Sequence, residues 1–142
     1  MVRSCRNIGW FRTLREHYSN IRLQVCSTVN VFNVLYLEEL AQWIDQQNFD
    51  YVYWNMMHEA YYFSISTLPA DAKYAITTKL QHSEVDDRTR QEFTQIIDFM
   101  NRGVGLDGNI LRMRVADLDR KRNQDLSVTE PEFAKLINYV KT

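Results

Sequence analysis

Hydrophobic and polar residues alternate in two short stretches of the chain, and both stretches predict β-strands. In residues 21–29 (IRLQVCSTV), Ile21, Leu23 and Val25 fall on one face and the residues between them fall on the other. Residues 50–57 (DYVYWNMM) are rich in aromatic and β-branched side chains. A period of two with these residue types is typical of strands.

A helical period separates the two strands and also precedes the first one. Residues 34–47 space their apolar side chains three and four positions apart, at Leu37, Leu40, Ala41 and Ile44. This spacing predicts an amphipathic helix. Residues 9–18 also have helical character. The order helix, strand, helix, strand predicts a parallel strand pair joined by a right-handed crossover.

Beyond an aromatic connection at residues 58–68, the pattern becomes helical throughout. We expect one helix over residues 69–82 and another over residues 109–122. Between them, a capping box at Ser83 and Asp86 predicts a helix that continues to Met100. A capping box at Thr129 and Glu132 predicts a final helix, whose apolar stripe comprises Phe133, Leu136, Ile137 and Val140.

Two strands are too few for a stable parallel sheet. The pattern therefore predicts that a partner supplies further strands, or that the sequence is a piece of something larger.

Composition and charge favour an ordinary globular protein. Hydrophobic residues make up 45% of the chain, charged residues 25%, and the net charge is -1. This balance directs the molecule neither to nucleic acid nor to an anionic membrane. The longest uncharged stretch, residues 23–37, is too short and too polar to span a bilayer. We expect a cytoplasmic protein without a nucleic-acid or membrane partner.

The cysteines and histidines do not follow a metal-site pattern. Cys5 and Cys26 lie far apart without a partner at ligand spacing, and we expect reduced thiols, with Cys26 in or near a core. The three histidines, His17, His58 and His82, are widely separated, so we do not expect a zinc site.

Three segments resemble a known family. They are STVNVFNVLYLEEL, FDYVYWNMMHEAYYFSISTLPADAK and DLDRKRNQDLSVTEPEFAKL. They resemble the C-terminal region of the twitch-domain-containing radical SAM proteins that are common in phage genomes, over roughly residues 10–142. The resemblance implies an α/β fold. Residues 1–68 would form the last strands of a partial (β/α) barrel, and residues 69–142 would form a C-terminal helical cap.

In that family an N-terminal half carries CxxxCxxC, which holds a [4Fe–4S] cluster, and S-adenosylmethionine is cleaved at the open iron. Here the chain has only Cys5 and Cys26. The resemblance therefore implies a C-terminal fragment or separately encoded half of a radical SAM enzyme. By itself this chain would bind neither cofactor and would not be catalytically competent. Its partner would be the chain that supplies the cluster-binding half.

The alternative is a stand-alone protein-binding or assembly module that uses strand edges and helices, including as a homo-oligomer. Exposed strand edges and a wealth of aromatic side chains favour association. Whether the chain is an enzyme stays open at this point.

The candidate site is the carboxyl end of the two strands, where ligands bind in parallel sheets. It comprises Thr28, Asn30 and Asn33 after the first strand, and Asn55, His58 and Glu59 after the second. In a complete enzyme these residues would contact the adenosylmethionine or the substrate.

The alternation supports this site, because Gln24, Cys26 and Thr28 would face a polar lumen. A structural alternative is that Asn30 and Asn33 form the turn after the strand.

Overall fold

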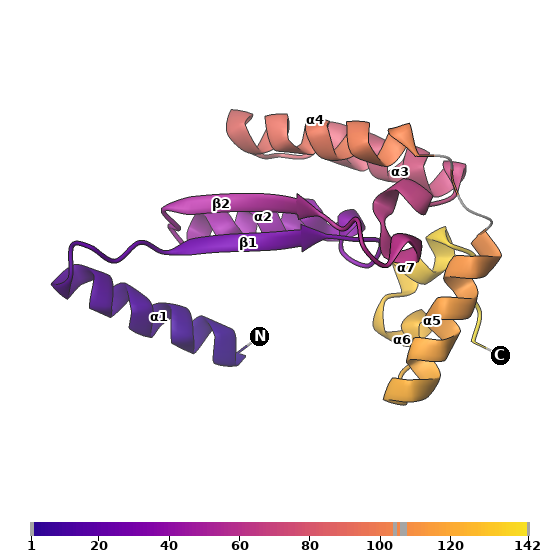
Figure 1. Cartoon of the computed structure of the whole chain (residues 1–142), viewed down its shortest axis with the longest axis horizontal. Helices are drawn as coiled ribbons and strands as arrows, with labels where there is room; N and C mark the ends of the chain where they lie inside the picture. Colours follow the sequence, from indigo (N-terminus) through magenta and orange to yellow (C-terminus); the bar gives the residue numbers. More distant parts are fainter. Residues whose placement is uncertain (1, 104, 106–107, 142) are drawn as a thin grey trace.

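The computed structural model describes residues 2–103, 105 and 108–141, and it consists mainly of helices around a short sheet (Figure 1). The elements along the chain are α1 (Val2–His17), β1 (Gln24–Val29), the 3-10 turn η1 (Val34–Tyr36), α2 (Leu37–Gln46), β2 (Tyr51–Met56), the 3-10 turns η2 (Tyr61–Phe63) and η3 (Ile65–Thr67), α3 (Ala70–Gln81), α4 (Asp87–Arg102), α5 (Gly108–Arg122), α6 (Leu126–Thr129) and α7 (Pro131–Leu136).

The two predicted strands form a parallel pair with α2 between them in the chain. Gln24 lies opposite Tyr51, and the register continues to Val29 opposite Met56. The predicted strands and the helix between them are therefore confirmed. The first helix begins earlier than expected, at Val2 rather than near residue 9.

The prediction of a partial (β/α) barrel is wrong. The part of the chain described contains a two-stranded sheet, β1 beside β2, and is otherwise mostly helical. A strand–helix–strand unit is shared by barrels and by many smaller α/β arrangements, so its pattern does not determine the number of strands. The elements found in residues 69–103 and 108–141 are helices, as the pattern predicts, and these residues add no strand to the sheet.

One face of the sheet is buried against helices. Val29 is fully buried, and Trp54 of β2 packs edge-on against Phe93 of α4 with ring centroids 5.9 Å apart. The same core continues into the C-terminal region, where the rings of Phe32 and Phe133 pack together with their centroids 6.0 Å apart. Residues before and after position 68 therefore share one hydrophobic core, which holds the sheet on the helical part.

A buried lysine fastens the connection after β2 to the end of α4. Lys73 Nζ donates to the carbonyl oxygens of Ser66 and Gly103, each at 2.7 Å. Burial lowers the pKa of Lys73. At Gly103 an added Cβ would lie 2.6 Å from the Ser66 carbonyl oxygen, so the close backbone approach requires glycine.

The C-terminal turns are organised by a buried carboxylate. Asp119 of α5 is 7% exposed; it accepts hydrogen bonds from the Leu126 backbone N–H at 2.8 Å and from the Tyr139 hydroxyl at 2.9 Å.

The expected capping box at Thr129 and Glu132 is wrong. The residue before α7 is Glu130, which makes no side-chain cap, and the side chain that caps α6 is Asp125. Val140 was expected in the apolar stripe of the last helix, but α7 ends at Leu136 and Val140 is 77% exposed.

We expect Asp119→Ala to lower the free energy of unfolding by about 3 kcal/mol, because it leaves two buried donors without an acceptor. Urea denaturation measures the loss. The matched control is Asp117→Ala on the same helix, where the carboxylate pairs with the exposed Arg120 and Lys121. Removing these surface pairs should cost less than about 1 kcal/mol. Equal losses in the two variants would contradict a structural role for Asp119.

Stability should also fall at high pH. Desolvation, and then the hydrogen bond to Asp119, raise the pKa of Tyr139 to about 12. An unfolded tyrosine ionises near pH 10. The neutral hydroxyl therefore contributes stability that is fully present below about pH 10 and is lost as the pH rises toward 12. Chemical denaturation of wild type and Tyr139→Phe between about pH 8 and about pH 12 tests this pH dependence. The variant should show a shallower decline, and parallel curves would refute the assignment.

Candidate functional site

Two of the residues predicted at the strand ends lie side by side. Thr28 is opposite Asn55 in the register, and both side chains are exposed on the face of the sheet away from α2 and α4. Asn55 Nδ2 lies 2.8 Å from the sulfur of Cys26 and donates to it. The structure therefore places Thr28 and Asn55 together.

Asn30 and Asn33 turn back on the chain. Asn33 Oδ1 accepts from the Asn30 backbone N–H at 2.9 Å, and both side-chain amides donate to the Thr28 carbonyl oxygen, at 3.2 Å from Asn30 and 2.9 Å from Asn33. These hydrogen bonds are of the kind that asparagine makes in turns. They occupy the polar groups that a ligand would use, and a ligand-binding role for either residue stays a prediction.

His58 and Glu59 do not join this group. The His58 ring packs edge-on against Phe99 of α4 with centroids 5.1 Å apart, and Glu59 is exposed. Within the described segments no hydrogen bond or ion pair connects the two side chains. The geometry gives no support to an acid–base pair at these positions.

We expect Asn33→Ala to lower the free energy of unfolding by about 1–2 kcal/mol, because it removes two hydrogen bonds of the turn. Asn55→Ala removes only the exposed contact with Cys26 and should change stability by less than about 0.5 kcal/mol. Thermal or urea denaturation compares the two. A larger loss in Asn55→Ala would show that the open face contributes to stability in a way that this geometry does not explain.

The face of the sheet away from α2 and α4 is uncovered. Its exposed side chains are Gln24, Cys26, Thr28, Tyr51, Tyr53 and Asn55. The alternation predicted for the first strand is confirmed, because Val25 is more buried than its neighbours. The expectation that Cys26 lies in or near a core is wrong, since its thiol is exposed. Tyr51 and Tyr53 are 46% and 50% exposed, which is high for large aromatic side chains.

The outer edge of β1 also carries free backbone groups. The N–H groups of Tyr51 and Met57 donate to the carbonyl oxygens of Leu23 and Val29, so the backbone N–H and C=O groups of the odd-numbered residues of β1 face β2. The backbone groups of Gln24, Cys26 and Thr28 consequently point away from β2. The Thr28 carbonyl is satisfied by the two asparagines. The backbone groups of Gln24 and Cys26 have no partner among the residues that the structure describes.

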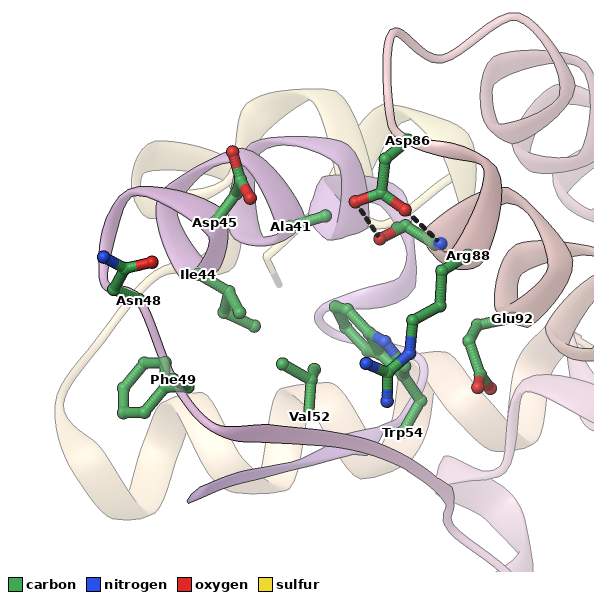
Figure 2. Close-up of a pocket in the computed structure, with 11 residues that line it drawn as sticks. Ala41, Ile44, Asp45, Asn48, Phe49, Val52, Trp54, Asp86, Arg88 and Glu92 are labelled. Atoms are coloured by element: carbon green, nitrogen blue, oxygen red, sulfur yellow. Dashed lines mark hydrogen bonds between the residues drawn. The ribbon is translucent and has the colours of Figure 1, made fainter. Parts of the chain in front are cut away.

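A pocket of about 170 Å³ lies on the buried side of the sheet, between α2, β2 and the start of α4 (Figure 2). Ala41, Ile44, Phe49, Val52 and Trp54 form its apolar surface. Its polar rim consists of Asp45, Asn48, Asp86, Arg88, Thr89 and Glu92.

The rim contains both engaged and free polar groups. Asp86 caps α4, and it accepts from the Thr89 backbone N–H at 2.8 Å and from the Thr89 hydroxyl at 3.2 Å. In contrast, Arg88, Glu92 and the Trp54 indole N–H have no hydrogen-bond or ion-pair partner within residues 2–103, 105 and 108–141. Sequence reasoning missed this site because tertiary packing brings its three elements together. The one local signal was the four-residue spacing of Arg88 and Glu92.

The described residues do not fit an iron–sulfur cluster. Such clusters are held by several cysteine thiolates, whereas the described side chains offer Cys26 alone. No group of three or more His, Cys, Asp or Glu side chains in the described ranges is arranged to hold a metal ion. Helices long and apolar enough to cross a membrane are also absent from these ranges.

Comparisons with protein-family models, with curated proteins and with solved structures gave no match to this chain. The resemblance to radical SAM proteins, and the iron–sulfur and S-adenosylmethionine chemistry that it implies, therefore stay predictions.

Proposed function

We propose that this chain is an assembly module that accepts an extended segment of another polypeptide at the outer edge of β1. The observation that carries the proposal is the free backbone of Gln24 and Cys26 on that edge. Each residue offers one donor and one acceptor, spaced two residues apart, which is the pattern that an added strand reads. Backbone hydrogen bonds would supply affinity, and the exposed face would supply side-chain contacts.

The residue types of β1 favour pairing. Edge strands that avoid association commonly carry charged residues or proline. Residues 24–29 (QVCSTV) contain neither. The two-stranded sheet is stabilised by packing against helices, but among the described residues no strand pairs with the outer edge of β1. An added strand would pair with the free backbone groups of that edge.

The edge of β1 is a better acceptor than the edge of β2. In Figure 1, α3 and α4 lie on the β2 side of the sheet, and Trp54 of β2 packs against Phe93 of α4. On the β1 side, the distance between helix α1 and the strand increases toward the N-terminal end of the helix. It is joined to the region after α2 by hydrogen bonds from Arg12 to the Gln47 carbonyl and by an ion pair between Arg15 and Asp50 at 3.1 Å.

A chain carrying the cluster-binding half of a radical SAM enzyme would be one source of such a segment. No feature of the described residues favours that source over another polypeptide. The proposal therefore rests on backbone geometry rather than on the resemblance.

Selection from a phage-displayed library of random peptides about ten residues long tests the proposal, a length that covers one strand and its flanks. We expect peptides that bind wild type and bind Cys26→Lys at least about tenfold more weakly, because a lysine on the edge opposes strand pairing. Calorimetry or fluorescence anisotropy measures the affinities, and circular dichroism checks that the variant is folded.

The matched control is Tyr53→Lys. Tyr53 lies opposite Cys26 on the same exposed face, but its backbone groups face β1 rather than an outer edge. It adds the same charge without altering the edge, so binding should stay within about threefold of wild type. Failure to select any peptide, or equal binding by Cys26→Lys, would refute the proposal.

A further inference from the structure

The pocket between α2, β2 and α4 combines an apolar floor with polar side chains that lack partners among the described residues. The Arg88 guanidinium and the Trp54 indole N–H are donors, the Glu92 and Asp45 carboxylates are acceptors, and Asn48 offers an amide. This inference is independent of strand pairing at β1, because the pocket lies on the opposite face of the sheet.

The Trp54 side chain is the most constrained of these groups. The residue is 9% exposed and lines the pocket, and its ring is fixed by contact with Phe93. An indole N–H can only donate, and that of Trp54 is open to solvent at the pocket and has no acceptor among the described residues. A ligand oxygen in the pocket would take the place of water as its acceptor.

Arg88 and Glu92 are four residues apart on α4, a spacing at which opposite charges commonly pair on a helix. Here no ion pair joins them. Figure 2 shows Arg88 reaching from α4 toward Trp54, while Glu92 stands further along the same helix. Glu92 is half-buried. The two charges are thus placed to contact different groups of one ligand.

The apolar floor of the pocket indicates which uncharged part a ligand would have. Ile44, Val52 and Phe49 are apolar, and the volume of about 170 Å³ suits a small hydrocarbon body, since a cavity of about 150 Å³ holds benzene. A purely anionic ligand would meet the carboxylates of Asp45, Asp86 and Glu92 on the rim. A purely cationic ligand would make no hydrogen bond with the Trp54 and Arg88 donors and would meet the positive charge of Arg88.

We propose that this pocket binds a free α-amino acid with an apolar side chain. The carboxylate of the amino acid accepts hydrogen bonds from Arg88 and from the Trp54 indole N–H, and its ammonium group pairs with Glu92. The side chain lies on the floor formed by Ile44, Phe49 and Val52. Arg is suited to carboxylates because its planar guanidinium presents two parallel donors.

The test is titration of the full chain with L-leucine, followed by calorimetry and by the indole N–H resonances in ¹⁵N-correlated NMR spectra. We expect saturable binding and a shift of the Trp54 indole resonance, which Trp54→Phe identifies by its disappearance. Arg88→Gln and Glu92→Gln should each weaken binding at least about tenfold. The control Arg122→Gln alters an arginine at the end of α5, outside the pocket lining, and should bind as wild type does.

Two leucine derivatives separate the charged contacts. Leucinamide lacks the carboxylate and N-acetyl-leucine lacks the ammonium group, and we expect each to bind at least about tenfold more weakly than leucine. Absence of binding up to about 10 mM would overturn the proposal, as would equal binding of all three compounds or unchanged affinity in Arg88→Gln and Glu92→Gln. Cys26→Lys should bind leucine normally, so failure here is separable from failure of strand pairing.

Discussion

The burial of one face of a two-stranded sheet is the constraint on which the rest of this structure depends. Trp54 and Val29 face the helices, and Trp54 contacts Phe93 of α4. Because side chains alternate across a strand, fixing this face also fixes the opposite one. Gln24, Cys26 and Tyr53 are consequently exposed. The same packing aligns α2 and α4 over β2, and so creates the pocket that contains Arg88 and Glu92.

Both proposals follow from this one-sided cover. A sheet in a larger α/β protein is buried on both faces and continued by further strands. In the described residues β1 is covered on one face, and no further strand pairs with its outer edge. Its sequence contains no charged residue that would oppose pairing with an additional strand. On the covered side the helices do not fill the space above Val52, and polar groups left without partners surround the gap. The proposed association, at the edge of β1 and the exposed face, and the proposed ligand binding, on the covered face, would therefore use different side chains.

Local patterns in the sequence were sufficient for the elements themselves. The alternation in residues 21–29 predicted β1 and its exposed face, and the spacing of Leu37, Ala41 and Ile44 predicted α2. These features depend on neighbours within a few residues. Helix boundaries set by distant contacts were predicted less well. The turn before α6 is held by Asp119, seven residues before Leu126 and twenty before Tyr139, and no local rule identifies that carboxylate.

The larger errors came from questions that periodicity does not answer. A strand–helix–strand pattern cannot specify how many strands share a sheet, and the barrel expectation rested on the resemblance. Of the predicted site, Thr28 and Asn55 do lie together because parallel strands end at one edge. Asn30 and Asn33 were predicted at the right place, but their amides serve the turn. The pocket at Trp54 could not be predicted, since its walls come from three separate elements.

Amide hydrogen exchange along β1 in the dilute, isolated chain tests the central claim most directly. If β1 pairs only with β2, the amides of Val25 and Ser27 face β2 and exchange slowly, whereas those of Gln24 and Cys26 face the free edge and exchange quickly. The account predicts this alternation. Equal protection at all four amides would show that the outer edge of β1 is already paired, and would contradict it.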